Sequence, residues 1–219
     1  MMKKTTFRLV ATAGAAAAAV ALASCASGPS PADLDKIAAQ TMQASFRDQG
    51  IAKIDRIKQD LAQAACSSDK APDEATAARI MADAKASVKW PAGGQYLGDW
   101  REGEKIAQNG RGMTWTDASA APTANGGNCY NCHQISKEEI SYGTIGPSLY
   151  NYGKNRGITS FTSPSVQPIF EYTWAKLYNA RTTNACSQMP RAGHMGLLNE
   201  DQLRHVMALL LDPKSPVNQ

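Results

Sequence analysis

Five consecutive residues, Cys129-Tyr130-Asn131-Cys132-His133, carry the clearest chemical pattern in the sequence. The pattern is C-x-x-C-H, the signature of covalent c-type haem attachment. Two thiols separated by two residues can both reach the vinyl groups of one haem and add across them. The histidine that follows is placed to ligate the iron from the proximal side. The sequence therefore predicts one covalent haem c held by Cys129 and Cys132, with His133 as the proximal ligand.

Three other interpretations of this motif compete with haem attachment. A structural zinc site also uses C-x-x-C but needs a second ligand pair, and the sequence has no other C-x-x-C and no H-x-x-x-H. A thioredoxin-type redox pair should follow an apolar strand, whereas this motif follows Ala124-Asn125-Gly126-Gly127-Asn128, a loop-forming run. The third alternative is chance. The missing second ligand pair and the missing strand favour haem.

Two motifs further along the chain have the order found in one family of haem proteins. Gly146-Pro147-Ser148-Leu149 follows the haem motif, and Met189-Pro190 precedes a terminal helix. This order resembles the class I cytochrome c family, whose fold is all-α. The resemblance implies that the carbonyl of Pro147 accepts the ring N–H of His133 and that Met189 is the distal ligand. The rival distal ligands are His194, Met195 and Met207, and we expect His205 to face solvent.

Four longer stretches contain or extend these motifs, namely residues 127–135, 143–149, 184–191 and 207–218. They resemble the SoxX family, the monohaem subunits of bacterial SoxXA sulfur-oxidation cytochromes, and the resemblance covers about residues 96–219. Ala192 departs from it, because many members carry a larger, aromatic residue there. The resemblance implies an electron-transfer subunit of an L-cysteine S-thiosulfotransferase complex, not catalytic by itself. A SoxA-like haem subunit would join thiosulfate oxidatively to a cysteine of a sulfur-carrier protein. This chain would accept the electrons and pass them to a downstream cytochrome.

Two functions from other classes also fit the haem motif. A generic lipid-tethered electron carrier for another periplasmic oxidoreductase would share every haem residue but lack the terminal signature. A haem enzyme or gas sensor would leave one iron position open, so Met189 would not be a ligand. Both alternatives stay open on the residues alone.

Residues 1–24 have the features of an export signal. A charged start is followed by an alanine-rich apolar run, Leu9 to Ala23, which is too short to span a bilayer comfortably. The run ends in Leu22-Ala23-Ser24-Cys25, which resembles the bacterial lipobox, where the cysteine is lipidated and becomes the first mature residue. Ordinary cleavage after Ala23 is the alternative. We predict a periplasmic lipoprotein anchored to a membrane through Cys25.

The formal net charge of +4 overstates the basic character of the mature chain. Of the 23 Lys and Arg residues, three lie in the export signal, which leaves 20 against 19 acidic residues. A nucleic-acid-binding protein would show a strongly basic face. The near-neutral balance gives no reason to expect a nucleic-acid partner.

The rest of the chain has helical periodicity and no strand-rich region, which predicts an all-α fold. We expect a tether and helical extension over residues 25–95 and the class I cytochrome c domain over residues 96–219. Apolar stripes in the extension predict helices over 34–46, 51–65 and 72–88, which we interpret as packing that covers the haem domain, the alternative being a partner-docking arm. In the second domain we expect helices over 99–108 and 168–180 and a terminal helix capped by Asn199.

The sequence has five cysteines, of which two are assigned to haem and one to lipid. Cys66 and Cys186 remain, an even number in a compartment where disulfides persist. Parity and compartment therefore predict that they pair. Closing so long a loop could stabilise the fold by roughly 3–5 kcal/mol.

Overall fold

The computed structural model describes residues 28–219, so the predicted export signal and Cys25 lie outside the described residues. The chain forms two compact units, one ending at Arg47 and one spanning Asp48–Gln219. Apart from an isolated bridge between Gln49 and Ala52, residues 28–219 contain helices, turns and irregular segments without a β-strand. The all-α prediction is therefore confirmed. Within this part of the chain, no helix combines the length and the apolar character needed to cross a membrane.

The first unit contributes one described helix, α2 (Pro31–Ser45). A capping box starts it, because the Ser30 hydroxyl accepts the N–H of Asp33 and the Asp33 carboxylate accepts the N–H of Ser30. The helix buries none of its residues, and both Leu34 and Ile37 on its apolar stripe are exposed. The apolar stripe of α2, which the sequence pattern predicts to be buried, therefore faces solvent within its own unit.

The second apolar stripe, residues 51–65, does not form the single helix that its spacing predicts. It contains a 3-10 turn, η1 (Ile54–Ile57), and then a separate short helix, α3 (Leu61–Cys66). The Asp60 carboxylate accepts the N–H of Gln63, and the Gln63 side chain accepts the N–H of Asp60. This capping box begins a new helix at that point. Local hydrogen bonds determine the secondary structure of this segment, because little of its apolar surface is buried.

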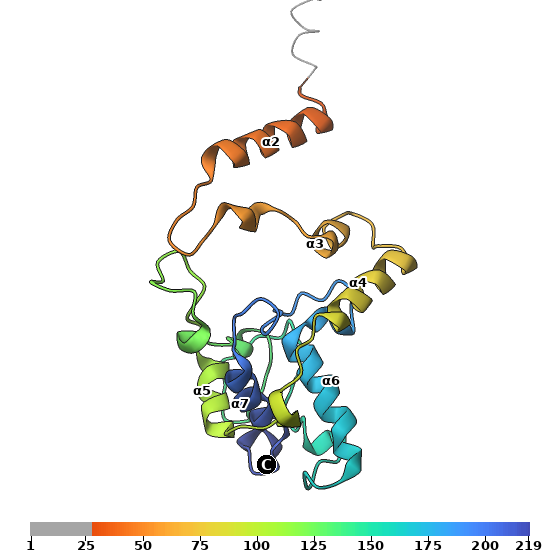
Figure 1. The fold of residues 1–219 in the computed structure, drawn as a ribbon, viewed down its shortest axis with the longest axis vertical. Coiled ribbons are helices and arrows are strands. Elements are labelled where there is room, and N and C mark those ends of the chain that lie inside the picture. The colour runs from red at the N-terminus through yellow and green to blue at the C-terminus, as the bar shows by residue number, and fades with distance from the viewer. Residues whose placement is uncertain (1–27) are drawn as a thin grey trace, which may run out of the picture. The chain divides into compact units, whose positions relative to one another are not determined.

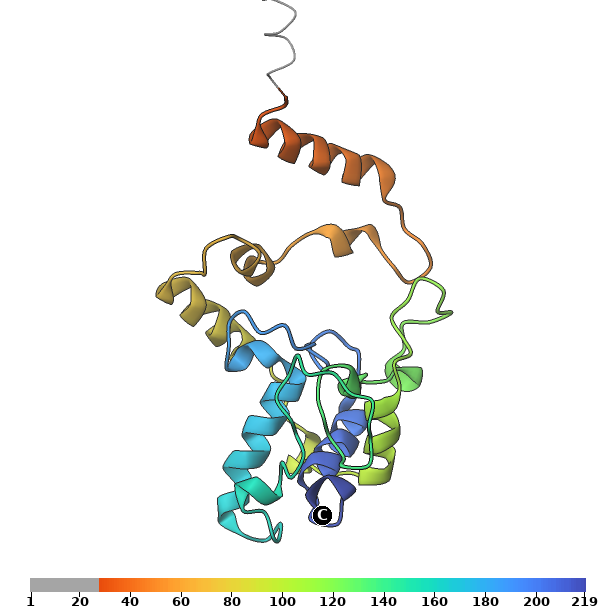
Figure 2. The same ribbon diagram turned by 180° about the vertical axis from the view of Figure 1, so that it is seen from behind.

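The second unit is built on four longer helices, and α7 lies at its centre. They are α4 (Glu74–Ala86), α5 (Trp100–Gln108), α6 (Gln167–Tyr178) and α7 (Glu200–Leu211). Figures 1 and 2 show α7 between α5 and α6 from opposite sides. Eight of the twelve residues of α7 are buried, so it supplies the middle of the apolar core. Asn199 caps it in a box with Gln202, as predicted.

Helices α5 and α7 approach each other closely because α5 carries a glycine at the contact. A Cβ on Gly103 would collide with the carbonyl oxygen of His205 and would lie 2.9 Å from the Cβ of Leu209. The N–H of Asp99, the residue that caps α5, donates to Nδ1 of His205 at 2.8 Å. His205 is therefore half-buried in this contact, and the prediction that it faces solvent is wrong. Its ring accepts a backbone N–H at the N-terminal end of α5 that would otherwise lack a partner.

Short 3-10 turns complete the second unit. They are η2 (Ala92–Gly94), η3 (Pro122–Ala124), η4 (Cys129–Asn131), η5 (Lys154–Arg156), η6 (Pro164–Val166), η7 (Ala180–Thr182) and η8 (Pro216–Asn218).

The segment after α4 runs across α6 and reaches the start of α7. The indole N–H of Trp174 on α6 donates to the carbonyl of Lys89 at 2.9 Å, and the N–H of Ala92 donates to Glu200 at 3.0 Å. Residues 48–95, which we expected within the extension, belong to the same compact unit as residues 96–219.

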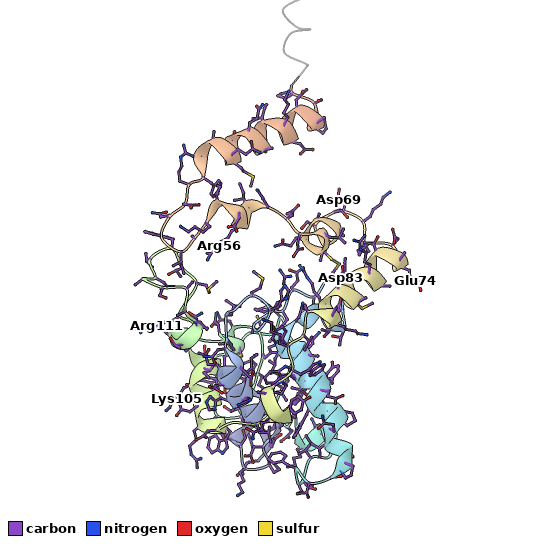
Figure 3. All side chains as sticks on the ribbon, viewed as in Figure 1. Arg56, Asp69, Glu74, Asp83, Lys105 and Arg111 are labelled. Carbon is purple, nitrogen blue, oxygen red and sulfur yellow. A yellow bond between two sulfur atoms is a disulfide. The ribbon has the colours of Figure 1, made fainter. Side chains whose placement is uncertain are left out.

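Charged side chains of both signs cover the outside of this unit. Lys105 on α5 and Glu74 and Asp83 on α4 are exposed and point away from their helices (Figure 3). Such mixed, solvated charges agree with the near-neutral balance of the sequence.

Replacing Gly103 by alanine should lower the free energy of unfolding by about 1–3 kcal/mol, because the added methyl group forces α5 away from α7. Chemical denaturation of both proteins measures the difference. Arg101→Ala on the exposed face of the same helix is the control and should change the value by no more than about 0.5 kcal/mol. An unchanged Gly103→Ala protein would contradict this account of the helix contact.

Candidate functional site

The C-x-x-C-H motif folds into one tight turn at the start of a long irregular segment. η4 begins after Asn128, which has a left-handed backbone with φ of 51°. The N–H groups of Cys132 and His133 both donate to the carbonyl of Cys129, at 3.1 and 3.0 Å. Cys129 and Cys132 are both half-buried, and neither forms a disulfide. The turn therefore presents two unpaired thiols and an imidazole within five residues.

Helix α5 holds this turn in place through the residues that precede it. The N–H of Gly127 donates to the carbonyl of Ile106 at 2.8 Å, and the N–H of Asn128 donates to the carbonyl of Asn109 at 3.0 Å. A Cβ on Gly126 would collide with that same Asn109 carbonyl. Only glycine allows the chain to pass so close, which gives the Gly126-Gly127 pair a physical role.

A buried carboxyl group on α5 also contacts the turn. The hydroxyl of Tyr130 donates to Oε1 of Glu104 at 2.9 Å, and Oε2 of Glu104 is buried without a hydrogen-bond partner among the described residues. Burial raises the pKa of Glu104, and hydrogen bonds from Tyr130 and Gln108 oppose that rise. This carboxyl group therefore keeps its proton to a higher pH than a solvated glutamate would.

A second segment, residues 143–149, lies against residues 130–134, and we call this arrangement the clasp. Three backbone hydrogen bonds of 2.7 Å join the two segments, from Gly143 to Tyr130, from Gly146 to Cys132 and from Leu149 to Gln134. The hydroxyl of Ser148 adds a bond to the Gln134 side chain at 2.9 Å. The clasp thus holds the backbone on both sides of His133.

The clasp also fixes the ring of His133. Its Nδ1 lies 2.7 Å from the carbonyl oxygen of Pro147, the pair that the cytochrome resemblance implies. A carbonyl oxygen can only accept, so Nδ1 carries the proton and donates it, and Nε2 of the neutral ring keeps a free lone pair. A Cβ on Gly146 would collide with the ring, so the glycine lets the clasp close over it. Such a ring is oriented as a metal ligand requires.

The Cys129 thiol does not have the environment of a redox-active cysteine. Burial raises the pKa of the Cys129 thiol to about 12, and Cys132 and Glu104 add to the rise. Reactive thiols of the thioredoxin type have depressed pKa values, and a protonated thiol is a poor nucleophile. In residues 28–219, no three His, Cys, Asp or Glu side chains are grouped to hold a metal ion. The described residues thus give no support to the redox or zinc interpretation.

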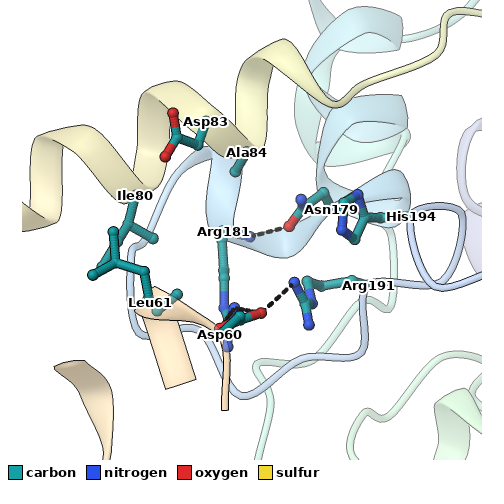
Figure 4. Close-up of a pocket in the computed structure, with 10 residues that line it drawn as sticks. Asp60, Leu61, Ile80, Asp83, Ala84, Asn179, Arg181, Arg191 and His194 are labelled. Atoms are coloured by element: carbon teal, nitrogen blue, oxygen red, sulfur yellow. Dashed lines mark hydrogen bonds and ion pairs between the residues drawn. The ribbon is translucent and has the colours of Figure 1, made fainter. Parts of the chain in front are cut away.

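Met189 and its rivals occupy different environments. Met189 is half-buried against the main apolar core, which Cys129 also contacts. Met207 is fully buried within α7, and Met195 is 50% exposed. His194 lines a cavity together with Arg181 and Arg191 (Figure 4). Of the four candidates, Met189 is the one that combines partial burial with contact to the core beside the haem motif.

That cavity, of about 170 Å³, contains an ion cluster that the sequence did not reveal. Nη1 of Arg181 and Nη1 of Arg191 each lie 3.2 Å from Oδ2 of Asp60 (Figure 4). Nearby, Cys66 and Cys186 form the disulfide that parity predicts, with their Cα atoms 5.4 Å apart. Asp60 and Arg181 are 121 residues apart, and no local pattern signals a pair at that separation.

Apolar side chains lie exposed within the clasp and in the residues just before it. Ile140 is 93% exposed and Ile145 is 84% exposed, and Tyr142 between them is also exposed. Grouped apolar side chains on a protein surface mark places where something else binds. These three exposed side chains therefore mark a candidate binding surface.

Comparison with known proteins identifies a relative of this chain, while no family model matches it. A protein of Aquifex aeolicus (strain VF5), named as an uncharacterized lipoprotein, is 36% identical over 167 residues. The match covers 74% of this chain and 73% of the relative. The chain belongs to the same family as this lipoprotein.

Replacing Gly146 by alanine should lower the free energy of unfolding by about 1–3 kcal/mol, because the methyl group displaces the His133 ring or opens the clasp. Nitrogen-15 NMR of the ring should also show the loss of the proton held at Nδ1. Thr144→Ala, at an exposed position of the same segment, is the matched control and should leave both measurements unchanged. An intact Nδ1–H signal in Gly146→Ala would show that the ring does not depend on this contact.

Proposed function

We propose that this chain is a monohaem c-type cytochrome of the class I fold. Cys129 and Cys132 would hold the haem through thioether bonds, and Nε2 of His133 would ligate the iron. The observation that carries the proposal is the hydrogen bond from His133 to Pro147, because it uses Nδ1 as the donor and leaves Nε2 as the ligating atom of a ring fixed next to two unpaired thiols. When bound, the haem would supply one-electron transfer.

Met189 is the proposed distal ligand. It is supported by partial burial beside the core that the haem motif also contacts, whereas His194 faces the arginine-lined cavity. Ligation by His and Met raises the reduction potential relative to other axial pairs, which suits an electron acceptor. A filled distal position would also leave no open iron site, which argues against a haem enzyme or gas sensor.

Within the cytochromes, we assign the chain to sulfur oxidation as a SoxX-like subunit. A SoxA-like partner would join thiosulfate to a carrier-protein cysteine, forming a sulfur–sulfur bond and releasing two electrons. The single haem of this chain would take those electrons one at a time and pass each to a downstream cytochrome. The support is the resemblance of the four sequence stretches, and the terminal one also has a structural role. The Asn218 side chain accepts the N–H of Gly153 at 2.8 Å and donates to the carbonyls of Leu210 and Asp212, which closes the end of α7.

We further propose that the protein is a lipoprotein of the cell envelope, attached through Cys25. The support is the lipobox-like sequence ending at Cys25 and the name of the Aquifex relative. Stable attachment needs more than one acyl chain, which lipidation of such a cysteine supplies. The haem domain would then act in the periplasm while tied to a membrane.

The haem proposal predicts one covalently bound haem per chain when the protein is produced with cytochrome c maturation machinery. Mass spectrometry of the denatured protein should show the added haem, because thioether bonds survive denaturation. Cys129→Ala/Cys132→Ala should lose it, whereas the matched pair Cys66→Ala/Cys186→Ala should keep it. A wild-type chain without covalent haem would overturn the proposal.

The sulfur-oxidation role predicts that the haem is reduced by thiosulfate only when the SoxA-like partner and the carrier protein are both present. Absorption spectroscopy follows the reduction, and carrier protein with its cysteine blocked is the control that should give none. Reduction by another periplasmic oxidoreductase in place of this system would indicate the generic electron carrier. Turnover of thiosulfate by the isolated chain would also refute the assignment.

A further inference from the structure

Two long-range ties bracket Met189 on either side. Cys186, three residues before it, is bonded to Cys66 at the end of α3. Arg191, two residues after it, pairs at 3.2 Å with Asp60, the residue that caps the start of α3. The short helix α3 is therefore attached to the Met189 segment at both of its own ends.

The ionic tie is more than a surface pair. Arg181 joins it with Nη1 at 3.3 and 3.2 Å from the two carboxylate oxygens of Asp60. The side chains of Arg181 and Arg191 are only 13% and 16% exposed. Because both guanidinium groups are largely withdrawn from water, their attraction to the carboxylate is less screened than in an exposed pair. Partial burial raises the pKa of Asp60, but the N–H of Gln63 and the two guanidinium groups outweigh it and lower the pKa overall.

Helix α3 is itself held by apolar packing. Ala62 forms a small buried cluster with Ile80 on α4 and with Ala185, the neighbour of Cys186. Figure 4 shows Leu61 and Ile80 on one side of the cavity and Arg191 on the other. The Met189 segment is thus attached to a packed pair of helices, the α3–α4 corner, and not to an unstructured part of the chain.

Apart from the packing of Met189 against the core, backbone hydrogen bonds do little to fix the Met189 segment. Residues 183–191 contain no helix or strand. The N–H of Met189 makes a hydrogen bond of 3.4 Å to the Ser187 hydroxyl, which is at the long end for such a bond. A segment without a ladder of backbone hydrogen bonds opens at low cost unless side chains hold it.

From these contacts we infer that Asp60 and the Cys66–Cys186 disulfide are positioning groups for the distal ligand, which keep the Met189 thioether on the haem iron. This inference rests on the proposed haem site. Neither group is a proposed iron ligand. They act by restricting the segment that carries Met189, and the loss of either tie should raise the fraction of molecules in which the methionine is detached.

The test measures how readily exogenous imidazole replaces the methionine in the oxidised, haem-loaded full chain. A ligand that binds the detached state has an apparent affinity that rises with the population of that state. Asp60→Asn keeps the oxygen that caps Gln63 and removes the charge. It should tighten imidazole binding by roughly threefold to tenfold and weaken the methionine-to-iron absorption band. Cys66→Ser/Cys186→Ser should act in the same direction, and Met189→Ala marks complete loss of the band.

Asp83→Asn is the matched control. Asp83 lines the same cavity, but its side chain is 69% exposed and its ion pair is with Arg79 at 3.9 Å, away from the Met189 segment. It should leave the imidazole affinity, the band and the reduction potential unchanged. The Asp60→Asn protein should show a lower potential, because methionine ligation is what raises it.

The outcomes separate the inference from the proposed function. If the wild-type chain carries no covalent haem, the proposed site fails and the inference with it. If haem and the methionine band are present, but Asp60→Asn and the serine pair bind imidazole like wild type, the inference alone is overturned. A lower thermal midpoint without any change in imidazole affinity also overturns the inference alone. Because Asp60→Asn keeps the disulfide, it decides the question even where the serine pair does not fold.

Discussion

The close approach of α5 to α7 at Gly103 is the contact on which the rest of the second unit depends. Helix α7 fills the middle of the core, and α5 reaches it only because no side chain separates the two backbones. Glu104 and Ile106 of α5, with Asn109 just after the helix, then hold the turn of the C-x-x-C-H motif. The position of the motif therefore depends on a helix pair as well as on the clasp.

The two proposed iron ligands are supported in different ways. His133 is held by the clasp, whose hydrogen bonds join segments within 20 residues of each other along the chain. Met189 depends on ties to residues about 120 positions away, through a disulfide and an ion cluster. Short connections lose little chain entropy on closing, whereas long ones lose more. The proximal side can thus form locally, while the distal side requires the α3–α4 corner to be in place.

The sequence predicted well the features that local rules govern. The caps at Asp99 and Asn199 and the buried stripe of α7 follow from capping chemistry and helical spacing. The prediction of one helix over residues 51–65 was wrong, because it rested on spacing alone and did not take account of the capping box at Asp60. The Cys66–Cys186 pair came from counting thiols and the His133–Pro147 contact from the family resemblance. The cluster of Asp60, Arg181 and Arg191 had no sequence signal, because charged residues are common and only the fold shows which ones meet.

The Cys66–Cys186 bond also bears on the order in which the protein can be assembled. Along the chain, Cys129 and Cys132 lie between the two partners. Four thiols can pair in three ways, and the native bond is formed in only one of them. In each of the other two, Cys66 is joined to a cysteine of the C-x-x-C-H motif, which blocks both haem attachment and the native bridge. Capture of Cys129 and Cys132 by haem would remove these competitors, so haem attachment before oxidation would leave Cys66 and Cys186 only each other to pair with.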